Sequence, residues 1–125
     1  MAKILILDDE PANRYLVRSI LTPAGHLVIE AADGVEALRL VRAEQPDLVI
    51  IDLFMPRMSG TDFVRALRSD GAIAQTRLAL YTGSPADDAM LDFMAMTQIA
   101  HLIPKPSEPA ELARIVADAC ADVRA

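Results

Sequence analysis

The chain is short of several residue types, and each shortage excludes a class of protein. Tryptophan is absent and Cys120 is the single cysteine, so the 125 residues form no internal disulfide and no cysteine-rich metal site. Lysine and arginine number 12 against 18 acidic residues, which gives a formal net charge of −6. A nucleic-acid-binding surface needs an excess of basic residues, so we expect no nucleic-acid partner.

Long apolar runs are also absent. No stretch approaches the roughly 20 apolar residues that cross a bilayer, and the N-terminal run at residues 4–7 is too short for a signal peptide. We therefore predict a cytoplasmic protein with no membrane contact. The length and the 53% hydrophobic content suit one domain around one core. Cys120 lies in a helical run of small and apolar residues, so we expect it in that core.

Two kinds of segment alternate along the chain. Short runs rich in Ile, Leu and Val predict strands at residues 3–7, 27–30, 48–51, 78–82 and 100–103. Helical spacing predicts helices at residues 11–21, 34–44, 59–69, after Pro85, and at 109–123. The apolar faces of the last four helices are expected to contain Val35, Leu38, Val41, Phe63, Val64, Leu67, Met90, Leu91, Met94, Leu112, Ile115, Val116 and Ala119.

Five strand–helix pairs with nearly continuous apolar strands predict an α/β fold, a doubly wound five-stranded parallel sheet with helices on both faces. In such sheets the ligand lies beyond the carboxyl ends of the strands. Asp8 and Asp9 follow the first strand, Asp52 follows the third, Thr82 ends the fourth and Lys105 follows the fifth. The polar candidates are therefore expected to meet at one rim.

Three carboxylates at one rim repel one another unless a cation neutralises them. Oxygen ligands favour a hard ion such as Mg²⁺, and an aspartate can act as a nucleophile that forms an aspartyl phosphate. A transferred phosphoryl group also needs positive charge and hydrogen-bond donors around its oxygens. Lys105 can supply the charge, and Thr82 with the backbone near Gly83 can supply the donors.

The sequence resembles the response-regulator receiver family of two-component signalling over the whole chain. The resemblance rests on residues 4–10 (ILILDDE), 32–38 (ADGVEAL), 46–52 (PDLVIID), 55–60 (MPRMSG), Thr82 and Lys105–Pro106. It implies a strand order of 2-1-3-4-5 and one receiver domain over residues 1–125, with no effector domain in this chain. It also implies a phosphoacceptor switch that catalyses only its own phosphorylation and dephosphorylation.

Carried onto this chain, the resemblance makes Asp52 the phosphoacceptor, which takes its phosphoryl group from a sensor histidine kinase or a phosphotransfer protein. Asp9 and Asp52 would bind Mg²⁺ directly and Asp8 would act through a water molecule. The backbone carbonyl of Phe54 would complete the protein ligands.

The resemblance also assigns roles around the phosphoryl group. Lys105 would pair with the acceptor and then with the phosphoryl oxygens, and Thr82 would move its hydroxyl onto them. The bond between Lys105 and Pro106 is expected to be cis, which proline tolerates at little cost.

The chain departs from the family pattern at positions expected to transmit the phosphorylation signal to a partner. Leu102 stands where the family usually has an aromatic residue, three positions before the lysine, and Tyr81 is a candidate substitute for it. Gln98 stands at the end of the fourth helix where glycine is usual. We therefore expect activation to appear mainly as movement of residues 82–85 and of the fourth helix.

Two residues are expected to control the lifetime of the phosphorylated form. Phe54 and Ser84 lie two positions beyond Asp52 and Thr82, so they should flank the path of a hydrolytic water. Phe54 offers no hydrogen bond to orient that water, which predicts slow self-dephosphorylation.

The fourth helix is a candidate surface for a downstream protein target, together with the fifth strand and fifth helix. Met90 and Met94 are expected in the core, whereas Phe93 and Met96 fall on other sides of the helix and would expose apolar area. His101, at the start of the fifth strand, is a candidate partner contact.

Two other functions fit the sequence less well. An aspartate-nucleophile phosphatase commonly carries a second acid two residues after the nucleophile, and Phe54 at that position cannot transfer a proton. A flavin-binding module needs a Ser/Thr/Gly-rich phosphate loop after the first strand. Residues 8–11 are instead Asp-Asp-Glu-Pro, which repel phosphate in the absence of a metal.

Overall fold

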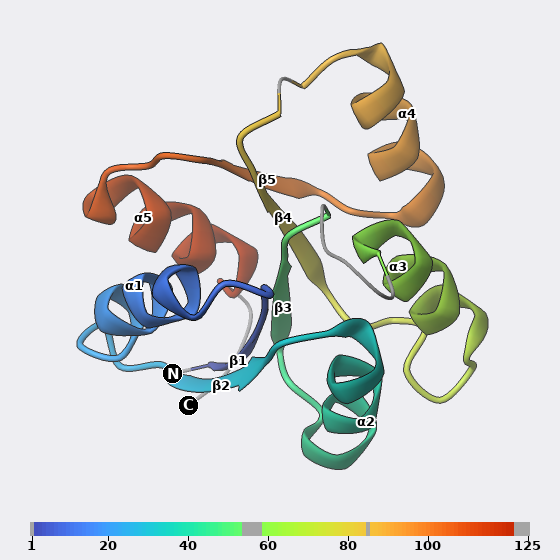
Figure 1. The fold of residues 1–125 in the computed structure, drawn as a ribbon, viewed down its shortest axis with the longest axis horizontal. Coiled ribbons are helices and arrows are strands. Elements are labelled where there is room, and N and C mark those ends of the chain that lie inside the picture. The colour runs from blue at the N-terminus through green and yellow to red at the C-terminus, as the bar shows by residue number, and fades with distance from the viewer. Residues whose placement is uncertain (1, 54–58, 85, 122–125) are drawn as a thin grey trace.

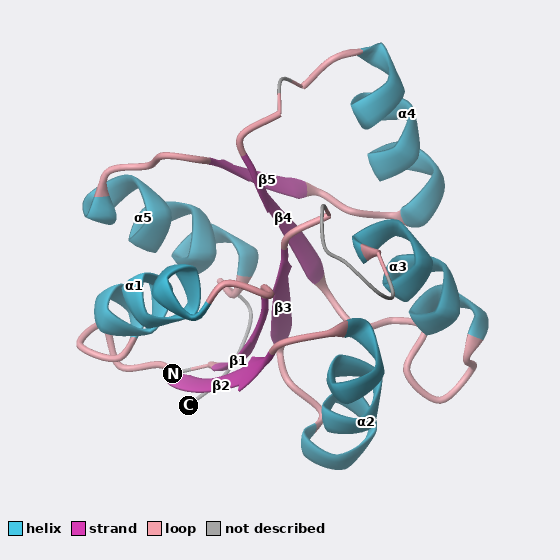
Figure 2. Cartoon of the chain, in the orientation of Figure 1, coloured by secondary structure: helices cyan, strands magenta, loops and turns pink. Residues whose placement is uncertain are grey.

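Strands and helices alternate along the chain in the computed structural model, which describes residues 2–53, 59–84 and 86–121 (Figures 1 and 2). Within these residues there are five of each. The strands are β1 (Lys3–Leu7), β2 (Leu27–Ala31), β3 (Leu48–Ile51), β4 (Leu78–Thr82) and β5 (His101–Pro104). The helices are α1 (Pro11–Leu21), α2 (Gly34–Glu44), α3 (Gly60–Ser69), α4 (Asp88–Thr97) and α5 (Pro109–Ala119). The predicted elements are confirmed, with small shifts at some ends.

The strands form one parallel sheet in the order β2-β1-β3-β4-β5, as expected. Leu5 pairs with Ile29 on one side and with Val49 on the other, which makes β1 an internal strand. Among the described strands β5 pairs only with β4, so it is an edge strand, where the missing N–H of Pro104 is tolerated. All five carboxyl ends lie at one rim.

Alternate side chains of the strands enter two separate cores, because successive residues of a strand point to opposite faces. The buried strand residues packed with α2, α3 and α4 are Leu5, Leu7, Ala31, Val49, Ile51, Leu78 and Leu80. Those packed with α1 and α5 are Ile4, Ile6, Val28, Leu48, Ile50, Ala79, Tyr81 and Ile103. Figure 1 shows α1 and α5 on one side of the sheet and the other three helices opposite. Cys120 is buried in the second core, as predicted.

The starts of the helices follow from side chains that bind exposed backbone N–H groups. Asp33, Ser59 and Asp87 cap α2, α3 and α4 by accepting hydrogen bonds from N–H groups three residues further on. Pro11 and Pro109 occupy the first turns of α1 and α5, where their missing N–H costs nothing. None of the helices in the described part of the chain has the length and hydropathy needed to cross a bilayer.

Two of the residues expected on apolar helix faces are exposed. Val35 is 67% exposed, whereas Leu38 and Val41 are buried. The buried stripe of α2 is centred on the line from Gly34 to Val41, and Val35 lies about 100° round the helix from Gly34. Leu91 is 52% exposed for the same reason, since α4 turns its other face to the core.

Arg68 of α3 holds the C-terminal end of α4. Its guanidinium donates hydrogen bonds to the carbonyls of Thr97 (2.7 Å), Ala74 (2.8 Å), Thr76 (2.6 Å) and Gln98 (3.3 Å). Gln98 adopts a left-handed backbone conformation (φ 59°), the role that a glycine would usually play. The end of α4 is thereby tied to α3 and to the segment that precedes β4.

Candidate functional site

Asp8 and Asp52 lie side by side because β1 and β3 are paired up to Leu7 and Ile51, the residues that precede them. The ladder of backbone hydrogen bonds continues one residue beyond both strands. The N–H of Asp52 donates to the carbonyl of Leu7 (3.0 Å), and the N–H of Asp8 donates to the carbonyl of Ala31 (3.2 Å). The backbones of both aspartates are thus fixed by the sheet.

Asp8, Asp9 and Asp52 form a cluster in which one carboxylate oxygen from each lies within 4.8 Å of the others. Asp8 is buried (1% exposed), and its Oδ1 accepts a hydrogen bond from the N–H of Glu10 (2.9 Å). The donor set is oxygen only and carries a high negative charge, which fits a hard divalent cation such as Mg²⁺. The predicted meeting of these three residues is confirmed.

Lys105 reaches the cluster from the far side of β4. Its Nζ lies 3.2 Å from Oδ2 of Asp8 and 3.5 Å from Oδ2 of Asp52. The backbone N–H of Lys105 donates to the carbonyl of Thr82 (3.0 Å), which continues the pairing of β4 with β5. The peptide bond between Lys105 and Pro106 is cis, as expected.

Tyr81 supports Lys105 and does not replace the aromatic residue that the family has at position 102. The ring centroid of Tyr81 lies 4.7 Å from Nζ of Lys105, a cation–π contact. Burial raises the pKa of the Tyr81 hydroxyl. Tyr81 belongs to the core beneath α1 and α5, whereas Leu102 packs against the other core. The suggested substitution of Tyr81 for the aromatic at Leu102 is therefore wrong, because the two side chains lie on opposite faces of the sheet.

Thr82 is buried (2% exposed) at the end of β4. Its Oγ1 accepts a hydrogen bond from the N–H of Ser84 (3.1 Å), so the hydroxyl hydrogen is what Thr82 can offer to another oxygen. The backbone of Ser84 is thereby tied to Thr82 at the rim, and its expected place beside the path of a hydrolytic water stays a prediction. Phe54, which was expected to contribute a carbonyl ligand and to flank the water path, lies outside the described residues, as does Pro85.

Gly60 and Arg14 contact the backbone of the aspartate cluster. The predicted strands and helices did not indicate either contact. A Cβ on Gly60 would lie 2.4 Å from Cα of Leu53 and 2.7 Å from the carbonyl oxygen of Asp52. Two sequence signals point to position 60: a glycine directly after the capping Ser59, where a better helix former is usual, and its place in the 55–60 motif of the resemblance. Arg14 donates to the carbonyl of Asp8.

The 2-1-3-4-5 parallel sheet, with three carboxylates, a lysine and a threonine at its carboxyl rim, defines a class of protein: the α/β phosphoacceptor switch. Comparison with known proteins identifies the family within that class. The family model for the response regulator receiver domain matches residues 4–117. The chain belongs to this family, whose general role is to accept a phosphoryl group on an aspartate from histidine kinases or phosphotransfer partners.

Individual relatives agree with the family match. The chemotaxis protein CheY4 of Vibrio cholerae has a similar structure, with a TM-score of 0.88 and 30% identity over 95% of this chain and 98% of that one. Protein PilH of Pseudomonas aeruginosa is 35% identical over 66% of this chain and 68% of its own length. A probable transcriptional regulator, ycf27 of Guillardia theta, is 39% identical over 57% of this chain, but the match covers only 28% of that regulator.

Proposed function

We propose that Asp52 is the phosphoacceptor of this receiver domain. The observation that carries the proposal is the ion pair between Asp52 and Lys105, with Oδ2 and Nζ 3.5 Å apart at the carboxyl rim. The side chain of Asp52 is 12% exposed and that of Asp8 only 1%. Of these two ion-paired carboxylates, Asp52 is thus the one that an incoming phosphoryl group can reach.

In the proposed reaction, a carboxylate oxygen of Asp52 attacks the phosphorus of a phosphohistidine on the partner. The new O–P bond forms as the P–N bond breaks, and the imidazole nitrogen keeps the bonding electron pair and takes up a proton. Lys105 neutralises charge on the phosphoryl oxygens, and Thr82 donates its hydroxyl hydrogen to one of them. In this proposal the domain catalyses only its own phosphorylation and dephosphorylation.

Asp8, Asp9 and Asp52 would hold Mg²⁺ in this proposal. When bound, the ion supplies positive charge beside the acceptor and the phosphoryl oxygens. Asp8 is already engaged by Lys105 and by the N–H of Glu10, which suits the indirect, water-mediated role assigned to it. Asp9 and Asp52 would be the direct ligands.

The phosphorylation signal is proposed to pass from the rim through α4, β5 and α5 to a downstream protein. Nucleic acid takes no part in this proposal. Met96 (84%) and Leu91 (52%) are exposed on α4 and supply an apolar contact surface. Phe93, which was expected to add to this surface, instead packs partly buried against the core beneath α4.

Residues 1–125 would act as one receiver domain in the cytoplasm. Amide exchange with and without beryllofluoride should change in α4, and unchanged exchange there would place the output elsewhere.

The assignment of Asp52 can be tested by mass. Incubation with acetyl phosphate and Mg²⁺ should add one phosphoryl group to the intact protein, and Asp52→Asn should add none. Asp118→Asn, at an exposed acid on α5, controls for the loss of one carboxylate. A full adduct on Asp52→Asn would show that another residue is the acceptor.

A further inference from the structure

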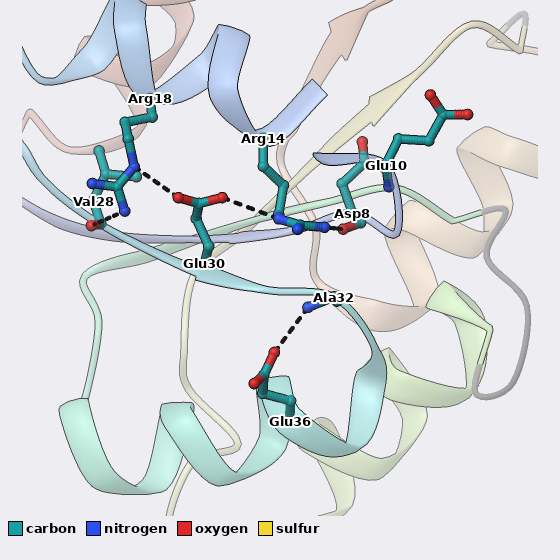
Figure 3. A network of polar contacts seen from close by, with 8 residues as sticks. All are labelled: Asp8, Glu10, Arg14, Arg18, Val28, Glu30, Ala32 and Glu36. Carbon is teal, nitrogen blue, oxygen red and sulfur yellow. Dashed lines mark hydrogen bonds and ion pairs between the residues drawn. The ribbon is translucent and has the colours of Figure 1, made fainter. Parts of the chain in front are cut away.

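The peptide unit that joins Asp8 to Asp9 is held by a side chain from α1. Nη1 of Arg14 donates a hydrogen bond of 2.7 Å to the carbonyl oxygen of Asp8 (Figure 3). Because a peptide unit is planar, fixing the direction of its carbonyl also fixes its N–H and the following α-carbon. That α-carbon belongs to Asp9. The contact with Arg14 therefore sets the point from which the Asp9 side chain departs toward the cluster.

Arg14 is itself held from the neighbouring strand. Its Nε donates to Oε1 of Glu30 on β2 (3.0 Å), and Oε2 of Glu30 accepts from Nε of Arg18 (2.7 Å). The side chain of Arg14 is only 16% exposed, and that of Glu30 is 31% exposed. Figure 3 shows Glu30 between the two arginines, with Arg14 turned to Asp8 and Arg18 turned to Val28. A guanidinium suits this place because its rigid fork makes both contacts in one plane, which an ammonium cannot do.

We propose that Arg14, held by Glu30, is a positioning residue for the metal-binding half of the site. It orients the Asp8–Asp9 peptide so that both carboxylates face Asp52. This inference rests on the proposed function, because it assigns Arg14 a task in the binding of Mg²⁺ by these aspartates. Outer-shell groups that orient metal ligands commonly change metal affinity by tenfold or more when removed.

The sign of the effect separates positioning from simple electrostatics. The guanidinium is a positive charge near a cation site, so its removal alone would strengthen Mg²⁺ binding. Loss of positioning would weaken it. Arg14→Gln removes the charge and the fork, whereas Arg14→Lys keeps the charge and loses the fork. Positioning predicts weaker binding in both variants, by about tenfold.

Arg18 provides a matched control for a purely structural brace. It lies one turn further along α1, contacts the same Glu30 and donates to the carbonyl of Val28 (3.2 Å), away from the aspartates. Arg18→Gln removes one tie between α1 and β2 and leaves the contact with Asp8 in place. A structural role alone would make the Arg14 and Arg18 variants similar in thermal stability and would leave Mg²⁺ binding in both no weaker than in the parent.

The experiment is a Mg²⁺ titration of the unphosphorylated full chain, followed by amide NMR signals at a temperature where each variant is folded. The expected result is a dissociation constant about tenfold higher in Arg14→Gln and Arg14→Lys and unchanged in Arg18→Gln.

Binding as tight as the parent's, or tighter, in the Arg14 variants overturns the inference. If Arg14→Gln does not fold, Arg14→Lys decides. A parent protein that binds no Mg²⁺ overturns the metal site of the proposed function as well, whereas a binding parent with unaffected Arg14 variants overturns this inference alone.

Discussion

Gly60 lies directly against the backbone carbonyl of Asp52, with no room for a side chain between them. A Cβ at position 60 would lie 2.7 Å from that oxygen and 2.4 Å from Cα of Leu53, so backbone would have to move. The N–H of Gly60 also donates to the carbonyl of Leu53 (3.0 Å). The start of α3 is therefore pressed onto the loop that carries the proposed acceptor.

Gly60→Ala should lower both stability and phosphorylation. The clash is with backbone, so we expect a loss of roughly 1–3 kcal/mol in the free energy of unfolding and slower labelling by acetyl phosphate. Urea denaturation and intact mass measure the two effects. Gly71→Ala is the control, because a Cβ there meets nothing within 4 Å. Equal behaviour of the two variants would show that the close approach at Gly60 does not matter.

Mg²⁺ should stabilise the unphosphorylated protein through the aspartate cluster. At ten times the dissociation constant the gain is about 1.4 kcal/mol, which raises the melting temperature by roughly 5 °C. The rise should shrink in Asp9→Ala, which loses a proposed direct ligand. Asp118→Ala removes an equal charge from an exposed site on α5 and should respond as the parent does. A full response in Asp9→Ala would place the metal elsewhere.

His26 should make stability depend on pH below neutrality. Burial lowers the pKa of its imidazole from the ordinary value of 6.5, and Nδ1 accepts a hydrogen bond from the N–H of Ala2 (3.3 Å). Just below pH 6.5 the unfolded chain therefore binds more protons than the folded chain, and stability falls as pH decreases from about 6.5 toward 5. His26→Gln should flatten this part of the profile in urea denaturation. His101→Gln controls for the loss of an imidazole, and a slope unchanged in His26→Gln would contradict the prediction.

Arg68→Ala should destabilise the protein more than other arginine substitutions on α3. Hydrogen bonds to charged groups are worth about 1.5–3 kcal/mol each, and four carbonyls would lose their donor. We expect a loss of at least about 2 kcal/mol and faster amide exchange at the C-terminal end of α4. Arg65→Ala, at an exposed position of the same helix, should change stability little. Equal losses in the two variants would mean that Arg68 contributes no more than helix propensity.

The rim could be predicted from sequence because parallel strands bring their carboxyl ends together. Asp8, Asp52, Thr82 and Lys105 each follow or end an apolar run, and strand pairing brings them together without further information. Gly60 neither follows nor ends an apolar strand, so strand pairing does not place it. Its role depends on the close approach of α3 to the loop after β3, and this distance is set by tertiary packing.

The face of the sheet on which a given side chain lies was harder to predict than the order of the strands. Tyr81 and Leu102 lie on neighbouring strands, and which side each one faces depends on the pairing of Leu80 with Leu102. A shift of one residue in that register would have put Tyr81 on the face of Leu102. Arg14 was missed for a related reason, since its contact with Asp8 spans only six positions but depends on the angle at which α1 leaves the sheet.

The bond between Lys105 and Asp8 joins residues 97 positions apart in the chain. Closing a loop of nearly the whole chain carries an entropic cost, which the packing of the intervening elements must offset. During synthesis from the N-terminus, Asp8 and Asp52 emerge long before their lysine partner. A nascent chain that lacks β5 carries Asp52, the proposed acceptor, without the ammonium group of Lys105 beside it. Under the proposed function, readiness for phosphorylation is therefore coupled to the docking of β5, the strand that brings Lys105 to the acceptor.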